Sequence, residues 1–283
     1  MKYCIFYNNI YLLKKSYFSK KIQIMILKHL PERTKKIRKT GITMVMDKGL
    51  SPIEAEGLME VASDLIDFVK LGFGTSIVTQ NLEKKIQIYK EAGVKVYFGG
   101  TLFEAFVIRK QFSDFIKWVK KYKIDTVEVS DGSIALEHEK KCEYISILAK
   151  DYLVLSEVGS KDESIIVRPN LWVKEMKDEL DAGSTYVIGE ARESGNVGIY
   201  TKSGNARVML IEKIKKELPV DKIIFEAPQK NQQVYFIKEF GTNVNLGNVA
   251  YQDVIALETL RLGLRGDTFF DFLPENYEEY KQK

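Results

Sequence analysis

The stretch TVEVSDG at residues 126–132 places Glu128 between two valines in a short β-branched run. The same pattern recurs in LVLSEVGSK (153–161), YVIGEARESG (186–195) and KIIFEAPQK (222–230). A glutamate stands at or near the end of each run, namely Glu128, Glu157, Glu190 and Glu226. Because side chains alternate across a strand, Glu128 faces a barrel interior if its two valine neighbours face the helices. The pattern therefore predicts four acids lining one rim of a barrel.

From Gly41 onward one unit recurs, made of a β-branched run, a loop and one amphipathic helix. The expected strands cover residues 42–46, 66–71, 95–99, 126–130, 153–158, 186–190, 223–227 and 244–248. Eight such units predict an α/β fold, the (β/α)8 TIM barrel. An open doubly wound sheet is the competing architecture, but no G-x-G-x-x-G follows the first strand, as that fold would lead us to expect.

Helix ends support this division of the chain. Ser51-Pro52-Ile53-Glu54 combines a capping serine, a proline in the first turn and the glutamate of a capping box. Gly93 and Gly183 suit the left-handed residue that closes a helix. No linker divides the chain, so we expect one barrel over residues 31–273 and a polar tail over 274–283.

The first 30 residues differ from the rest in charge. They hold six lysines and no acid, whereas the whole chain carries a net charge of +4. We expect an extension, either dispensable and preceding a true start at Met25 or forming a helix across the barrel floor. A basic excess confined to one terminus argues against a nucleic-acid surface, and the broken apolar runs argue against a membrane span. Two cysteines and two histidines exclude a disulfide framework and a multi-histidine metal site, and the cytoplasm is the expected compartment.

The predicted rim combines acids and cations. Four carboxylates suit a divalent cation, Mg²⁺, although a salt bridge to a lysine of a neighbouring strand would also explain an inward glutamate. Lys48, Lys70, Lys161 and Arg192 fall on or after strands and together suit a polyanion. Loops with Gln229 and Asn248 follow the last two strands, where barrels commonly bind phosphate. A metal, cations and a lysine together suit enolate chemistry.

Nine strings resemble the phosphosulfolactate synthase family, in order, from about Gly41 to Phe270. They are MDKGL, DFVKLGFGTS, VYFGGTLFE, VEVSDGS, EVGSK, DAGSTYVIGEARESG, IIFEAPQKNQQ, VNLGN and ETLRLGLRGDTF. The resemblance implies a Mg²⁺-dependent carbon–sulfur lyase on a (β/α)8 barrel, which adds sulfite to phosphoenolpyruvate and yields (2R)-phospho-3-sulfolactate. In the family this product serves coenzyme M or sulfolactate biosynthesis.

Roles follow from the resemblance and from rim position. Lys161 corresponds to the family's expected acid, and Glu157 is assigned to catalysis as well as to the metal. Glu157 and Glu190 are the first metal candidates, with Glu128 and Glu226 as further ones. The expected substrate contacts are Asp47, Lys48, Lys70, Arg192, Gln229 and Asn248.

Two other functions remain open at this stage. One is a non-catalytic relative of the kind associated with heat stress in plants, and the other is a different phosphoenolpyruvate-using barrel enzyme. The pathway that uses the product and the oligomeric state are also open. The apolar stripe of VIALETLRLGL fits either the barrel or a second copy of the chain in a homo-oligomer.

Overall fold

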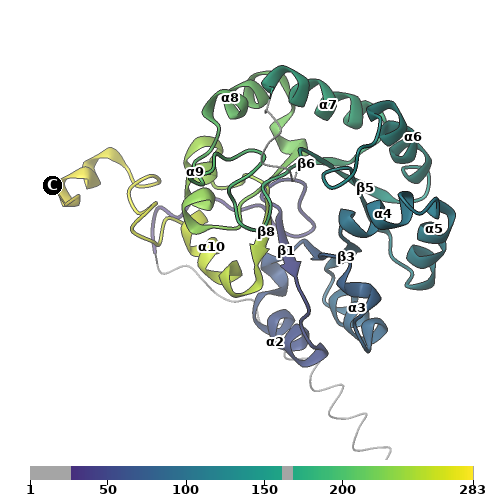
Figure 1. Ribbon diagram of the computed structural model, residues 1–283. Helices are drawn as coiled ribbons and strands as arrows, with labels where there is room; N and C mark the ends of the chain where they lie inside the picture. The colour runs from purple at the N-terminus through teal and green to yellow at the C-terminus, as the bar shows by residue number, and fades with distance from the viewer. Residues whose placement is uncertain (1–26, 161–167, 283) are drawn as a thin grey trace, which may run out of the picture. The chain divides into compact units, whose positions relative to one another are not determined.

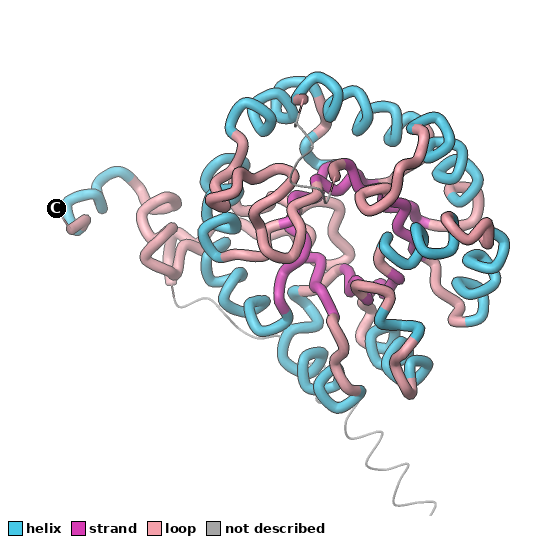
Figure 2. The backbone as a smooth tube through the Cα atoms, in the orientation of Figure 1, coloured by secondary structure: helices cyan, strands magenta, loops and turns pink. Residues whose placement is uncertain are grey.

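The computed structural model describes residues 27–160 and 168–282. The chain divides into two compact units, residues 1–30 and 31–283. The second unit holds eight parallel strands alternating with helices, and Figures 1 and 2 show the strands in the middle with the helices around them. The strands are β1 (Thr43–Asp47), β2 (Phe68–Leu71), β3 (Lys95–Phe98), β4 (Thr126–Ser130), β5 (Leu153–Val158), β6 (Tyr186–Gly189), β7 (Ile223–Glu226) and β8 (Leu246–Ala250). The predicted (β/α)8 barrel is confirmed, and the doubly wound alternative is wrong.

The helices cover the outside of the strands. They are α2 (Pro52–Ala62), α3 (Leu82–Glu91), α4 (Gly100–Val107), α5 (Phe112–Lys121), α6 (His138–Leu148), α7 (Pro169–Asp181), α8 (Val208–Glu217), α9 (Lys230–Phe240) and α10 (Val254–Arg261). The predicted capping box at the start of α2 is present, because the Ser51 hydroxyl accepts a hydrogen bond from the Glu54 amide and the Glu54 carboxylate accepts one from the Ser51 amide. Gly93 and Gly183 have φ of 69° and 118°, as expected of residues that close helices. The expectation of one helix per unit is wrong in the third unit, where α4 and α5 both follow β3.

The sheet is interrupted at one place. Hydrogen-bonded strands follow the order β3-β2-β1-β8-β7-β6-β5-β4, so β3 and β4 form its two edges. These edges pack beside each other and are bridged by side chains. Lys95 at the start of β3 pairs with Asp125 beside β4 at 2.6 Å. At the other end of the seam, the amide of Gly100 donates a hydrogen bond to the carboxylate of Glu128. Side chains thus close the barrel where strand hydrogen bonds do not.

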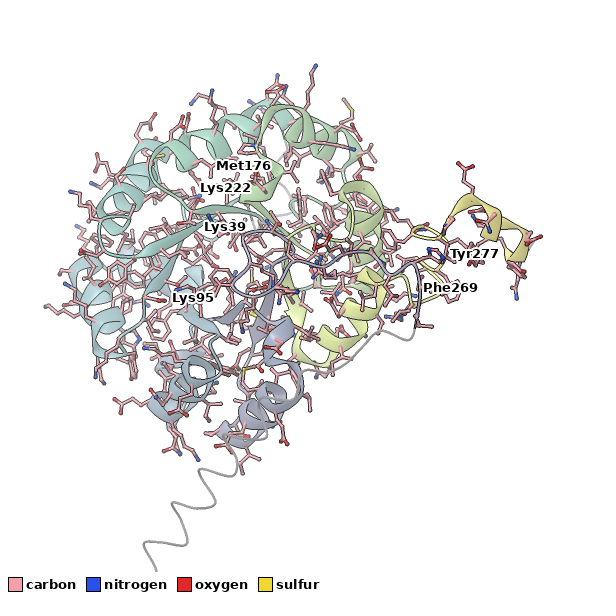
Figure 3. The ribbon with its side chains drawn as sticks, turned by 180° about the vertical axis from the view of Figure 1, so that it is seen from behind. Lys39, Lys95, Met176, Lys222, Phe269 and Tyr277 are labelled. Atoms are coloured by element: carbon pink, nitrogen blue, oxygen red, sulfur yellow. The ribbon has the colours of Figure 1, made fainter. Side chains whose placement is uncertain are left out.

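Residues 31–41 cross the end of the barrel at which the strands begin. Figure 3 shows this end, with Lys39 between Lys95, the first residue of β3, and Lys222, which directly precedes β7. The carbonyl of Lys39 accepts a hydrogen bond from the Tyr186 hydroxyl at 3.2 Å. Arg33 pairs with Glu258 of α10 at 2.9 Å. These residues leave the opposite end of the barrel, where the strands end, uncovered. A functional site is therefore expected at that opposite end.

A helix long and apolar enough to cross a bilayer does not occur among the described residues. The expected extension over residues 1–30 lies almost wholly outside them. Both of its interpretations therefore stay predictions.

Candidate functional site

Four glutamates from successive strands meet inside the barrel. Glu128, Glu157 and Glu226 belong to β4, β5 and β7, and Glu190 directly follows β6. None has more than 1% of its surface exposed. Glu157, Glu190 and Glu226 each offer one oxygen within 4.8 Å of those of the other two. The four glutamates Glu128, Glu157, Glu190 and Glu226 are here called the carboxylate cluster. They are the four acids that the sequence assigned to a metal.

Lys70 of β2 enters the carboxylate cluster from across the barrel. Its Nζ lies 3.0 Å from a carboxylate oxygen of Glu128, 3.0 Å from one of Glu157 and 3.3 Å from one of Glu226. Burial would lower the pKa of Lys70, but the three carboxylates raise it well above its ordinary value. The three carboxylates therefore favour the charged form of Lys70. A salt bridge to a lysine was the alternative explanation of an inward glutamate, and such a bridge is present. Its lysine comes from β2, which is not hydrogen-bonded to β4, β5 or β7, and it contacts three acids.

Lys70 alone does not neutralise the four carboxylates of the cluster. Burial raises the pKa of Glu226 to about 7, while Lys70 opposes the rise and Glu157 adds to it. Burial also raises the pKa of Glu128, again against Lys70. Carboxylates that cannot easily ionise together favour binding of a cation. Their oxygens are the ligand type that Mg²⁺ prefers.

Backbone amides fix the orientation of three of these acids. Gly100 donates to Glu128, Ala191 donates to Glu226 at 3.0 Å, and Arg192 donates to Glu190. The last two donors lie in the loop that follows β6. That loop turns back on itself at Gly198, where an added Cβ would lie 1.9 Å from the carbonyl oxygen of Glu190. Only glycine fits at this position. The loop conformation that Gly198 allows also places the amides of Ala191 and Arg192 against Glu226 and Glu190.

A pocket of about 550 Å³ opens above the cluster at the ends of the strands. Its wall includes the apolar residues Met46 and Phe73, the hydroxyl-bearing residues Thr101 and Ser133, and Arg192. Glu157, Glu190, Glu226, Lys70 and Asn248 also line it. The pocket therefore offers cations, hydrogen-bonding groups and buried carboxylates to one small ligand.

Three residues lining this pocket have a left-handed backbone although none is glycine. Phe73, Arg192 and Asn248 have φ of 55°, 54° and 51°. Such conformations are uncommon outside glycine and gather at active sites, where the surrounding structure holds them. The Asn248 side-chain oxygen, on a residue only 7% exposed, has no hydrogen-bond partner among the described residues. A ligand group would satisfy it.

Three of the six expected substrate contacts line the pocket, and three do not. Lys70, Arg192 and Asn248 line it. Lys48 is half exposed and pairs with Glu193. Lys161, the expected acid, lies outside the described residues.

Two further expected contacts are engaged elsewhere. Asp47 is fully buried, accepts hydrogen bonds from the amides of Gly49 and Leu50, and pairs with Lys85 at 2.9 Å. It thus shapes its own loop. Gln229 is the N-cap residue of α9, and its side-chain amide donates to the Ser194 carbonyl at 2.6 Å.

Sequence reasoning missed two hydroxyl residues of the pocket wall, Thr101 and Ser133. Each stands three residues after the end of a strand, Thr101 in the first turn of α4 and Ser133 in the loop after β4. Their position on the rim was the available signal, but serine and threonine are too common in loops to stand out by type.

Comparison with known proteins places this site in a family. The family model described as (2R)-phospho-3-sulfolactate synthase (ComA) matches residues 31–267. The chain belongs to the phosphosulfolactate synthase family. The phosphosulfolactate synthase of Bacillus subtilis (strain 168) is 43% identical over 244 residues, which cover 85% of this chain and 97% of the relative. The resemblance found in the sequence is thus confirmed, and the matched range contains every described residue of the pocket.

Two weaker similarities add context. Protein HEAT-STRESS-ASSOCIATED 32 of Arabidopsis thaliana is 22% identical over 261 residues, covering 81% of this chain and 88% of the relative. The crystal structure of 3-hexulose-6-phosphate synthase from Salmonella typhimurium is 13% identical with a TM-score of 0.51, covering 79% of this chain and 100% of that one. The second similarity reflects the barrel fold alone.

Proposed function

We propose that this protein adds sulfite to phosphoenolpyruvate and forms (2R)-phospho-3-sulfolactate, as a carbon–sulfur lyase. The carboxylate cluster beneath a pocket with Arg192 and Asn248 carries the proposal. The identity with the Bacillus subtilis synthase over 97% of that relative supports it. In the reaction, the sulfur lone pair of sulfite bonds to the methylene carbon, and the double-bond electrons move toward the carboxylate. A proton then reaches the carbon that bears the phosphate.

The cluster fits a resident Mg²⁺. Three buried carboxylates offer oxygens within 4.8 Å of one another, and Lys70 alone does not balance the charge of the acids around it. Glu157, Glu190 and Glu226 would hold the ion. When bound, Mg²⁺ supplies stabilisation of the negative charge that develops on the substrate carboxylate. Glu128 has a different task, because Lys70 and the Gly100 amide hold its carboxylate at the β3–β4 seam.

The other residues of the pocket position the substrate. The Arg192 guanidinium suits the phosphate or carboxylate of phosphoenolpyruvate, since it can donate two parallel hydrogen bonds. The Asn248 amide can accept or donate a further one. Met46 and Phe73 add apolar surface to the pocket wall. Lys161 is the proposed proton donor on the strength of the family resemblance.

The first experiment follows product formation from phosphoenolpyruvate and sulfite by phosphorus NMR, with Mg²⁺ and with a chelator. A phosphosulfolactate signal that needs both sulfite and Mg²⁺ would support the proposal. Turnover of phosphoenolpyruvate without sulfite would instead indicate a different enzyme of the same fold. No turnover by folded protein would favour a non-catalytic relative.

The Lys161→Ala variant then tests the proton donor. We expect it to lose turnover while the fold, followed by circular dichroism, is unchanged. Near-normal turnover would remove Lys161 from the mechanism.

A further inference from the structure

Behind the carboxylate cluster lies another buried lysine, Lys141 in the first turn of α6. It is 1% exposed, and its Nζ lies 2.8 Å from a carboxylate oxygen of Asp131 and 2.7 Å from one of Glu179. It also donates to the main-chain carbonyl of Glu157 at 2.6 Å. An ammonium group has three N–H donors, of which two donate to Asp131 and to the Glu157 carbonyl, while Glu179 forms an ion pair with it.

These three contacts join separate parts of the rim. Asp131 is the first residue after β4, and Ser133 of the same loop lines the pocket. Glu157 places its carbonyl against Lys141 and its carboxylate against Lys70. One ammonium therefore contacts both the loop after β4 and the main chain of a proposed metal ligand.

The third contact anchors this arrangement to the outer layer. Glu179 lies on α7, is fully buried and interacts with Ser156, the neighbour of Glu157 in β5. Ser156 in turn accepts a hydrogen bond from Ser184 at 2.7 Å. A buried ammonium tolerates little displacement, because moving away from any acceptor leaves an uncompensated charge. Lys141 thus links α6 and α7 to the end of β5, through Glu179 and the Glu157 carbonyl.

We propose that Lys141 is a positioning residue for the carboxylate cluster, holding the main chain at Glu157 and the loop from Asp131 to Ser133 where metal and substrate bind. The inference rests on the proposed function. Residues that orient metal ligands in this way typically change metal affinity or activity by about 10–100-fold when they are replaced.

The test variant is Lys141→Met/Glu179→Gln, in which the second substitution avoids leaving a charged Glu179 without its partner. The matched control is Arg261→Met. Arg261 is also a fully buried cation on main-chain carbonyls, donating to Thr242 at 2.6 Å and Val244 at 2.7 Å. Its acceptors precede β8, at the opposite end of the barrel from the pocket. A loss of stability alone would therefore affect both variants alike.

Mn²⁺ affinity, measured by electron paramagnetic resonance on the folded full-length chain, is the first readout. kcat and KM with phosphoenolpyruvate and sulfite are the second. We expect the double variant to bind Mn²⁺ at least 10-fold more weakly and to lose at least 10-fold in kcat, with a smaller change in KM. Lys141→Arg, which keeps the charge, should recover part of both losses. The control should stay within about twofold of the wild type in both.

Three outcomes would overturn the inference: a folded double variant with wild-type Mn²⁺ affinity and kcat, an equal loss in the Arg261 control, or a wild type that binds no Mn²⁺. The proposed function can fail separately. A wild type that binds Mn²⁺ without turning over the substrates would refute that reaction, and Mn²⁺ affinity would still decide the role of Lys141.

Discussion

Replacing Lys70 by methionine tests the electrostatics of the carboxylate cluster. The substitution removes one ammonium that lies 3.0 to 3.3 Å from carboxylates of Glu128, Glu157 and Glu226. At an effective dielectric constant of about 20, one contact near 3 Å corresponds to about 5 kcal/mol of Coulomb energy. Much of this offsets the desolvation of the ions. Measured costs of removing one partner of a buried pair are about 3–5 kcal/mol.

We expect the upper part of that range, because three carboxylates lose their shared cation. A loss of about 5 kcal/mol near pH 7.5 corresponds to a decrease of roughly 10–20 °C in the unfolding midpoint of a domain of this size. The loss should shrink on acidification. Without Lys70 the folded state takes up at least one additional proton, and each such proton recovers about 1.4 kcal/mol per pH unit.

The assay is thermal unfolding followed by circular dichroism, with a chelator present, at pH 7.5 and pH 5.5. Lys48→Met is the matched control, because Lys48 forms an ion pair with Glu193 but is 47% exposed on its side chain. Such pairs contribute about 0–1 kcal/mol. The reasoning is refuted if Lys70→Met unfolds within about 2 °C of the wild type at pH 7.5, or if its deficit is the same at both pH values.

Further predictions concern the metal, the loop after β6 and a buried acid. Glu157→Gln should raise the Mg²⁺ concentration required for half-maximal turnover by at least tenfold, and an unchanged requirement would exclude it as a ligand. Gly198→Ala should lower the unfolding free energy by more than about 1 kcal/mol and reduce kcat/KM. Gly57→Ala, in an open position of α2, should instead raise the unfolding free energy by about 0.4–1 kcal/mol and leave kcat/KM unchanged. Burial raises the pKa of Glu179 to about 7 from 4.5, against the opposing charge of Lys141, so the folded state binds this proton more tightly than the unfolded state. Stability from this group therefore falls between about pH 4.5 and pH 7, by up to about 3 kcal/mol, and Glu179→Gln should reduce that slope in urea unfolding.

Strand positions followed closely from local pattern. The predictions for β4 and β5 match the observed Thr126–Ser130 and Leu153–Val158, because β-branched runs bounded by polar loops define them. β8 begins at Leu246 rather than Val244, since its start depends on pairing with other strands. The boundary between α4 and α5 was missed because Arg109, Lys110 and Gln111 include neither glycine nor proline.

The sequence predicted which residues belong to the site better than it predicted what each of them does. Alternation and rim position identified the four glutamates, because both depend on local sequence. They did not show that Glu128 is held by Lys70 and the Gly100 amide, since those contacts form only when the barrel closes. Asp47 was expected to contact substrate because it ends a strand on the rim. Its carboxylate instead accepts hydrogen bonds from its own loop. Lys141 carried no signal, because a lysine near a helix start is usually exposed.

The interrupted seam between β3 and β4 has a consequence for how this barrel can be cut and rejoined. A circular permutant with new termini in the chain between Phe98 and Thr126 would begin and end at the two sheet edges and break no strand-to-strand hydrogen bond. The rearranged chain would read as one continuous sheet from β4 through β8 and β1 to β3. Amide protons of the two edge strands that face the seam should likewise exchange with solvent sooner than those of the interior strands.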